Sequence, residues 1–189
     1  AYDDTRFALA ARLWWLMRAL GYRPPRLLDG GYHAWLASGG AQAQGVPGVQ
    51  AVAVPEGAAF SGWLDRDGVI AAQAAGAVLV DAREARRYAG LEEPIDPVAG
   101  HIPGAINRPW QGVTDEHGRL LDDAGLRAHW DGADGAEALV LYCGSGVTAC
   151  VDLFSLARLG RVDATLYAGS WSDWCSHAGA VAGNLDEEA

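Results

Sequence analysis

The clearest hydrophobic pattern in the chain is an apolar run that stops at a cysteine and is followed by helical spacing. Residues 139–142 read Leu-Val-Leu-Tyr, and residues 147–159 place apolar side chains three and four positions apart. A short run of this kind bounded by glycine is typical of a buried parallel strand, and the second pattern is typical of an amphipathic helix. We therefore predict a strand, a glycine-rich loop that begins at Cys143, and a helix.

The alternation of apolar strands with amphipathic helices extends on both sides of this unit. It favours an α/β fold with a mostly parallel central sheet flanked by helices, and it places the loop at the carboxyl end of a strand. Residues 90–110 read mainly as loop. The other predicted strands are residues 77–81, 105–107 and 164–167, and the other predicted helices are residues 67–75, 83–89, 121–130 and 170–177.

Composition narrows the classes of protein that fit. The 189 residues carry a net charge of −10, which argues against nucleic acid or an anionic membrane as a partner. No apolar run approaches the ~20 residues of a membrane span. Three cysteines without close pairing favour a reducing compartment, so we expect a cytoplasmic protein. The five histidines lack metal-ligand spacing, so we expect no metal, and we propose no cofactor.

Cys143 is the candidate nucleophile because of its predicted place before a helix. Unpaired N–H groups at a helix N-terminus can lower the pKa of a thiol from about 8.5 to about 3.5–7.5. Gly144 and Gly146 would let the backbone close around the sulfur, and with Thr148 near the helix start they suit a cradle for an anion. The alternative interpretation is a buried cysteine beside an ordinary turn.

Two other cysteine chemistries fit the residues less well. A cysteine-based phosphatase needs an arginine six positions after the cysteine, where this chain has Ala149. A thioredoxin-type site needs a second cysteine three positions on, where this chain has Gly146. Cys150 and Cys175 are predicted to be buried small apolar residues, with a resolving role for Cys150 as the alternative.

Four segments resemble one family in the order that the family has them. The loop Cys-Gly-Ser-Gly-Val-Thr at residues 143–148 resembles the active-site loop of 3-mercaptopyruvate sulfurtransferases, which belong to the rhodanese superfamily. The resemblance implies a rhodanese-like domain. The other segments are Leu-Val-Asp-Ala-Arg at 79–83 followed by Arg87, Gly-His-Ile-Pro-Gly-Ala at 100–105, and Gly-Ser-Trp-Ser-Asp-Trp at 169–174.

The start of the chain echoes its end. Tyr2-Asp3, a helical pattern and a Leu-Gly pair match Tyr142-Cys143, its helix and its Leu-Gly pair in nearly constant register. Asp3 stands where the second copy has Cys143, so the first copy cannot form a persulfide. By resemblance it corresponds to the inactive first domain of two-domain sulfurtransferases. The Trp14-Trp15 pair in its helix is expected to pack in a core or between domains.

The repeat divides the chain into three parts. We expect the C-terminal part of an inactive rhodanese-like domain at residues 1–40, an interdomain linker at residues 41–62 and a catalytic rhodanese-like domain at residues 63–183. The first copy begins at what should be a late central strand and has no initiator Met, so the chain looks like a fragment. Residues 1–40 are then expected to expose a broken sheet with unpaired strand edges.

The resemblance implies that a persulfide on Cys143 carries sulfur from a small anionic donor to an acceptor. The acceptor would be a thiol, such as thioredoxin or a small thiol, or cyanide. Ser145 matches a loop serine that relays a proton, and Arg87 matches an arginine that binds the donor carboxylate. An exposed helix arginine beside Arg86 is the alternative for Arg87. The loop residues expected to hold the anionic sulfur through their N–H groups are Gly144, Gly146, Val147 and Thr148.

Two features bear on the choice of donor. Residues 92–96 lack the second carboxylate-binding arginine that mercaptopyruvate enzymes commonly have after Arg87, and the loop lacks the basic residues usual in thiosulfate-preferring rhodaneses. The loop favours 3-mercaptopyruvate, with thiosulfate as the alternative donor and a non-catalytic sulfur carrier or interaction module as the alternative function. Asp81 and His101, in the matching motifs, are expected to shape turns by hydrogen bonding.

Overall fold

The computed structural model describes residues 1–46, 48–51, 53, 60–133 and 135–177. Part of the predicted linker at 41–62, and residues 178–183 of the predicted catalytic domain, lie outside the described residues. The division of the chain into three parts stays a prediction. In the described residues, no helix combines the length and the hydropathy needed to cross a membrane.

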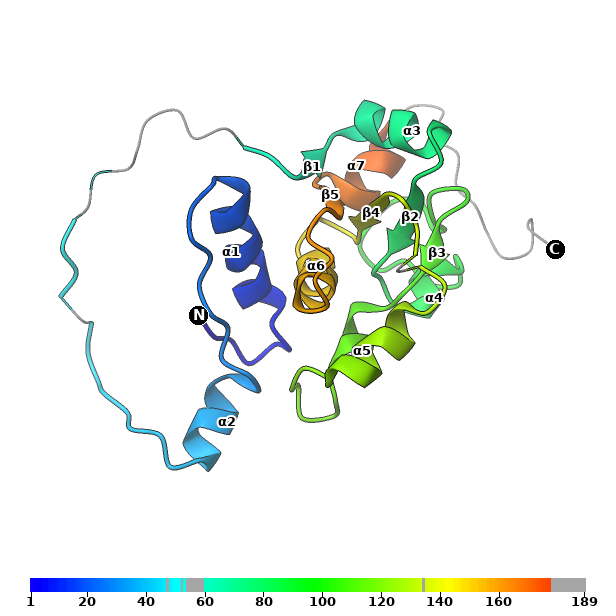
Figure 1. Ribbon diagram of the computed structural model, residues 1–189. Coiled ribbons are helices and arrows are strands. Elements are labelled where there is room, and N and C mark those ends of the chain that lie inside the picture. The colour runs from blue at the N-terminus through cyan, green and yellow to red at the C-terminus, as the bar shows by residue number, and fades with distance from the viewer. Residues whose placement is uncertain (47, 52, 54–59, 134, 178–189) are drawn as a thin grey trace.

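A five-stranded sheet forms the centre of the molecule (Figure 1). Its spatial order is β1-β5-β4-β2-β3, and every neighbouring pair is parallel. Parallel neighbours need crossover connections, which the helices provide. The strands are β1 (Trp63–Leu64), β2 (Val78–Asp81), β3 (Ile106–Asn107), β4 (Leu139–Tyr142) and β5 (Thr165–Tyr167).

β4 is the middle strand, and all four of its residues are buried. Leu141 pairs in register with Val80 of β2 and Leu166 of β5, and all three belong to one core cluster. Leu79 and Val140 belong to a second cluster, because successive side chains of a strand point to opposite faces of the sheet. Burial on both faces explains why the strand is a continuous apolar run.

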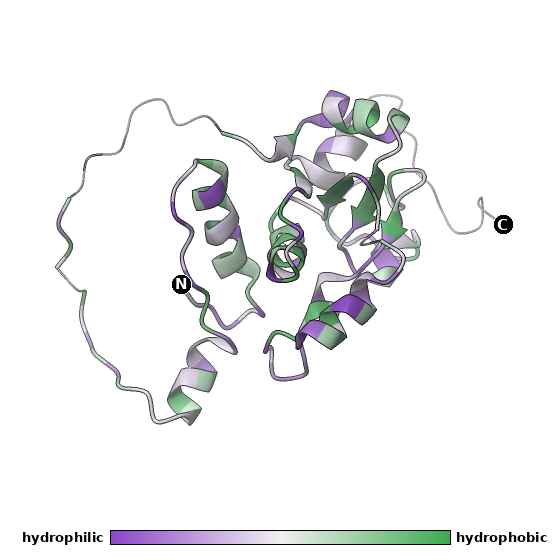
Figure 2. Ribbon diagram, viewed as in Figure 1, coloured by the Kyte–Doolittle hydropathy of each residue, from purple (hydrophilic) through white to green (hydrophobic). Residues whose placement is uncertain are grey.

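Helices cover both faces of the sheet (Figure 1). α3 and α7 contribute to the core cluster of Leu79 and Val140, whereas α5, α6 and the N-terminal helix α1 contribute to the other. Figure 2 shows hydrophobic residues concentrated in the central strands and α6. The bounds after β1 are α3 (Arg66–Ala74), α4 (Ala85–Tyr88), the 3-10 helix η1 (Trp110–Val113), α5 (Asp123–Trp130), α6 (Ala149–Arg158) and α7 (Ser170–Ser176).

The predicted α/β fold with a parallel sheet is confirmed, and the differences lie at the ends of elements. β1 was not predicted because a two-residue strand is too short to show a pattern. α6 begins at Ala149, two residues later than predicted, because Val147 and Thr148 complete the turn that follows the loop. η1 lies at the end of the segment predicted mainly as loop.

The N-terminal segment packs on the domain through α1 (Ala8–Ala19). The ring of Trp14 meets that of Phe154 on α6 edge-on, with 5.3 Å between the centroids. Trp14 and Trp15 are 8% and 4% exposed, so their predicted packing role is confirmed. The two helices lie side by side (Figure 1).

The expectation that residues 1–40 expose a broken sheet is wrong. This segment, all of which the structure describes, contains α1 and α2 (Gly31–Ala37) and no strand. A strand needs a hydrogen-bonded neighbour, and the five strands of the described sheet all lie within residues 63–167. The apolar side chains on the inner side of α1 are buried against α6.

Candidate functional site

Cys143 directly follows β4, at the carboxyl edge of the sheet, and is 2% exposed. The start of α7 holds its backbone, because the Cys143 N–H donates to Ser170 Oγ at 3.1 Å and the Trp171 N–H donates to the Cys143 carbonyl at 3.0 Å. Ser170 has a φ of 56°, in the left-handed region. The segment at residues 169–174 therefore closes over the loop that begins at Cys143.

The loop turns at Gly146, where only glycine fits. Gly146 has a φ of 74°, and a Cβ there would lie 2.5 Å from the carbonyl oxygen of Ala168. Its own carbonyl accepts from Arg12 Nη1 at 2.9 Å and from the Cys150 thiol at 3.4 Å. The turn thus lies close against Ala168, the residue after β5, and its carbonyl is bound from α6 and from the N-terminal helix α1.

The backbone N–H groups of this loop are available to a ligand. Within the described part of the chain, none of the five N–H groups at residues 144–148 donates to a protein acceptor. They lie between the end of β4 and the first turn of α6, where the helix dipole adds partial positive charge. The loop can therefore stabilise a negative charge beside Cys143.

The first copy of the loop already contains an anion. The carboxylate of Asp3 accepts four backbone N–H groups, at 2.7 to 3.1 Å, from Thr5, Phe7, Leu9 and Ala10. The Thr5 hydroxyl adds a bond of 3.0 Å. If residues 2–21 repeat residues 142–160, as the sequence predicts, Asp3 stands in the place of Cys143 and its carboxylate fills the matching loop.

Arg87 lies beside the loop but is already paired. A Cβ at Gly144 would lie 3.5 Å from Arg87 Nη1. The guanidinium donates to Glu93 at 2.7 Å and to Asp96 at 3.4 Å, and its side chain is 13% exposed. A donor carboxylate would have to replace these carboxylates. The alternative of an exposed helix arginine is wrong for Arg87, whereas it describes Arg86, which is 69% exposed.

A second arginine organises the same side of the sheet. Arg83 is buried, pairs with Asp81 at 2.6 Å and reaches Glu93 at 3.1 Å. Burial raises the pKa of Glu93, but hydrogen bonds from Arg87 and from two backbone N–H groups outweigh it, so the pKa lies below its usual value. Asp81 accepts hydrogen bonds from the backbone N–H and the guanidinium of Arg83, and His101 bonds the Tyr88 carbonyl at 2.8 Å, in keeping with their predicted hydrogen-bonding roles.

The remaining predicted residues divide between surface and core. Ser145 is exposed at the tip of the loop. Cys150 and Cys175 are buried, as predicted. Burial raises the pKa of the Cys150 thiol to about 12, so this sulfur stays protonated at neutral pH. It serves as a hydrogen-bond donor to the Gly146 carbonyl.

Three features of the site were not found from the sequence. Arg12 lies far from the loop in the chain, and Ser170 supports Cys143 only through the fold. Asp152, on α6, is fully buried, and neither of its carboxyl oxygens has a hydrogen-bond partner among the described residues. Burial raises the pKa of Asp152 well above its usual value, and the nearby Cys143 raises it further. The apolar spacing of the helix gave no sign of a buried carboxyl.

The sheet order and the cysteine loop before a helix define a class. Residues 65–177 match the family model described as a rhodanese-like domain, and the chain belongs to the rhodanese family. The predicted resemblance is therefore confirmed at the level of the family.

Among its relatives are sulfurtransferases. The chain is 41% identical over 179 residues to a putative thiosulfate sulfurtransferase, SseB, of Mycobacterium tuberculosis, which covers 93% of this chain and 63% of that protein. It is 42% identical over 184 residues to a probable 3-mercaptopyruvate sulfurtransferase of Pseudomonas aeruginosa, with 92% and 63% covered. A solved 3-mercaptopyruvate sulfurtransferase from Leishmania major superposes with a TM-score of 0.74 at 30% identity, covering 93% of this chain and 50% of the other. The chain thus spans under two thirds of these relatives.

Proposed function

We propose that this chain forms the persulfide-bearing part of a sulfurtransferase, with Cys143 as the nucleophile. The observation that carries the proposal is the cradle of N–H groups at residues 144–148. At the matching place in the first copy, the N–H groups of Thr5 and Phe7 bind the Asp3 carboxylate, and those of Leu9 and Ala10 join them. A persulfide anion on Cys143 would receive donors of the same kind. Preorganised donors of this kind stabilise developing negative charge without reorganisation.

The first half-reaction moves one sulfur atom from the donor to the enzyme. The Cys143 thiolate attacks the sulfur of 3-mercaptopyruvate, the S–S bond forms and the C–S bond breaks. The electron pair of that bond leaves on pyruvate as the enolate, which takes up a proton. Ser145, exposed at the tip of the loop, would relay this proton. Cys143 keeps the transferred sulfur as a persulfide.

The second half-reaction returns the enzyme to its starting state. A thiolate of a small thiol or of thioredoxin, or cyanide, attacks the outer sulfur of the persulfide. The S–S bond breaks and its electron pair returns to Cys143 as the thiolate. No external oxidant or reductant is needed, because the two electrons that the new S–S bond costs the sulfurs stay on the pyruvate carbon in the first step, and in the second step the S–S electron pair returns to Cys143 while the acceptor is oxidised.

Arg87 is proposed as the donor-binding residue, in exchange with its present partners. Its guanidinium lies beside Gly144 and is bound by Glu93 and Asp96. A carboxylate donor would displace these carboxylates and form a charge-assisted pair. The neutral loop favours 3-mercaptopyruvate over the thiosulfate dianion, and relatives are named for each donor. Thiosulfate stays the alternative donor, a sulfur carrier stays the alternative function, and we place the protein in the cytoplasm.

The test is intact mass and turnover with each donor. After incubation with 3-mercaptopyruvate or thiosulfate, the chain is expected to gain one sulfur, mapped to Cys143, and to release pyruvate repeatedly when a thiol is supplied with 3-mercaptopyruvate. A Cys143→Ser variant provides the control. Loading once without repeated turnover would identify a carrier, and no loading by either donor would contradict the proposal.

A further inference from the structure

The carbonyl of Gly146 is the point at which the N-terminal helix contacts the cysteine loop. Arg12, on α1, donates to this oxygen at 2.9 Å, and its guanidinium lies 4.8 Å from the centre of the Trp15 ring. The Cys150 thiol donates to the same oxygen at 3.4 Å. Because the high pKa of Cys150 keeps its proton in place, both bonds persist at neutral pH. The orientation of this carbonyl is therefore fixed from two helices.

A fixed carbonyl also fixes the N–H group on the other end of the same peptide. The described chain has no cis peptide bonds, and in a trans peptide the C=O and N–H bonds point in opposite directions. While the Gly146 oxygen points to Arg12, the Val147 N–H points away from α1. A rotation of this peptide would turn the carbonyl dipole, in place of the N–H, toward the cysteine side.

The first copy shows what this N–H group does. Phe7 corresponds to Val147 in the repeat, and its N–H donates to the Asp3 carboxylate at 3.1 Å. The preceding residues also correspond, since Arg6 and Gly146 have φ values of 55° and 74°. At Phe7 itself the copies differ, since Phe7 has a φ of 68° and Val147 does not have a positive φ. The first copy shows that the N–H of this peptide lies on the anion.

We propose that Arg12 is a positioning residue for the Cys143 site: by binding the Gly146 carbonyl, it aims the Val147 N–H at the anionic sulfur. The proposal assigns the N-terminal segment a direct part in stabilising the thiolate and the persulfide. It rests on the proposed function for the persulfide, but the effect on the thiolate is independent of any sulfur donor.

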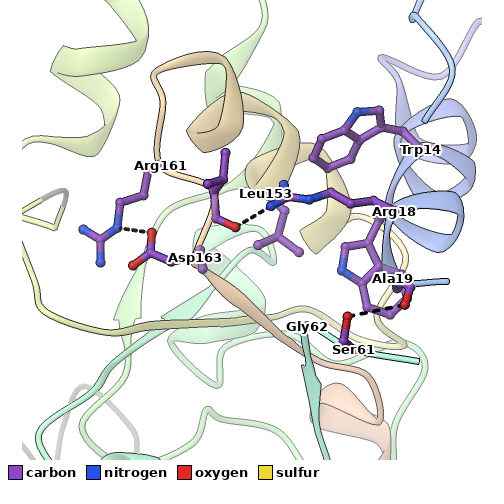
Figure 3. A pocket seen from close by; sticks show the side chains of 11 residues that line it. Trp14, Arg18, Ala19, Ser61, Gly62, Leu153, Arg161 and Asp163 are labelled. Carbon is purple, nitrogen blue, oxygen red and sulfur yellow. Dashed lines mark hydrogen bonds and ion pairs between the residues drawn. The ribbon is translucent and has the colours of Figure 1, made fainter. Parts of the chain in front are cut away.

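Arg18 provides a matched control on the same helix. It also lies over an indole ring, that of Trp14 at 5.5 Å, and also donates to a backbone carbonyl of the domain, that of Val162. Figure 3 shows this contact beside a cavity of about 270 Å³ that Arg161 and Asp163 also line. The cavity lies where the chain enters β5, at the opposite end of the strand from the cysteine loop. Loss of Arg18 weakens the same interface without touching Gly146.

The experiment measures the rate of Cys143 alkylation by iodoacetamide against pH in the wild-type chain, Arg12→Met and Arg18→Met. Met keeps an unbranched stem on the indole and removes the donors. Peptide mapping assigns the modified cysteine, and thermal unfolding verifies the fold. At neutral pH, Arg12→Met is expected to react about tenfold more slowly, with its pH profile moved upward, since one hydrogen bond to a charged system is lost. Arg18→Met is expected to match the wild type.

Three results would overturn the proposal. The first is a folded Arg12→Met variant that reacts like the wild type, and the second is an equal loss in Arg18→Met. The third is a wild-type rate that falls to the Arg12→Met level at high salt, because this would indicate a screened charge instead of loop geometry. Loading by 3-mercaptopyruvate is followed in parallel. If the wild type fails to load, the proposed function fails, while the alkylation rates still decide the role of Arg12.

Discussion

Asp3 and Cys143 hold corresponding positions in two copies of one loop, and each is followed three residues later by a residue with positive φ, Arg6 at 55° and Gly146 at 74°. The carboxylate fills the first loop through four backbone N–H groups. The thiol leaves the N–H groups of the second loop open. The side chain at this position therefore decides whether the loop binds its own anion, as at Asp3, or leaves its N–H groups open, as at Cys143.

Serine substitutions should distinguish the roles of the two cysteines that contact this loop, Cys143 and Cys150. Cys143→Ser is expected to reduce sulfur loading and turnover to background, because a hydroxyl has no comparable nucleophilicity. Cys150→Ser should keep most of the activity, since this buried thiol with a pKa of about 12 only donates a hydrogen bond to Gly146. Intact mass and pyruvate release measure both. An equal loss in the two variants would contradict a single-cysteine mechanism.

Removal of Arg87 should weaken donor binding. Arg87→Ala is expected to raise the KM for 3-mercaptopyruvate about 10- to 100-fold with a smaller effect on kcat, as for a lost charge-assisted hydrogen bond. Arg86→Ala, next in the chain, is the control, because Arg86 is 69% exposed and pairs with Glu92 on the surface. Steady-state kinetics measure the difference.

The same substitution leaves two acidic side chains without this cation. Glu93 and Asp96 have side-chain exposures of 4% and 8%. Tm must therefore be recorded with the kinetics. Unchanged KM in a folded Arg87→Ala variant would show that Arg87 serves structure and not the donor.

Gly146→Ala should destabilise the loop through two separate effects. The substitution forces a positive φ on alanine and places its Cβ 2.5 Å from the Ala168 carbonyl oxygen. We expect a loss of about 2–4 kcal/mol in the free energy of unfolding. Gly132→Ala isolates the conformational part, because Gly132 has a φ of 78° and nothing within 4 Å of the added Cβ. That control should lose only about 1 kcal/mol.

Both variants are compared by denaturant unfolding. A Gly146→Ala variant that is no less stable than Gly132→Ala would mean that the loop moves away from Ala168 at little cost. The close approach of Ala168, the residue after β5, would then contribute nothing to the stability of the turn.

Asp152→Asn should be more stable than the wild type by a margin that grows as pH rises from acid toward neutral. The folded-state pKa of Asp152 lies above its unfolded value of 3.8, so the folded chain binds more protons than the unfolded chain once pH exceeds 3.8. Stability then falls with rising pH until the folded pKa is passed. Asparagine keeps the shape without titrating. The variant is expected to gain on the wild type from acid toward neutral pH, in unfolding measured across that range.

The charged groups facing Asp152 are Cys143 and Asp81, and both disfavour its ionised form. The Asn variant removes this coupling as well as the cost of burial. A stability difference that does not change with pH would contradict a raised pKa for Asp152.

Local signals in the sequence were enough for the central strands and for the place of Cys143. The run at residues 139–142 is contiguous, and the loop and helix follow it directly, so neighbours in the chain determine the result. Contacts between segments that are distant in the sequence could not be predicted from these patterns. Arg12 and Gly146 are brought together only when α1 packs on α6, and the amphipathic spacing of α1 does not state which surface it covers.

The pairing of Arg87 shows another limit. The acidic residues at 92–96 were visible in the sequence as a departure from the family, but their effect depends on where the chain turns. The structure brings Glu93 onto both Arg83 and Arg87. A feature that was interpreted as weakening the anion site thus also neutralises and orients its arginines.

The filling of the first loop by Asp3 affects how many anions one chain is expected to bind. If the chain is a duplication, as its sequence predicts, two equivalent loops would ordinarily bind two equivalents of an anion per chain. Because Asp3 already occupies the donors of its own loop, the duplication is silent in an anion titration. Of the two loops, only the one at Cys143 remains to be titrated, and the expected stoichiometry is one.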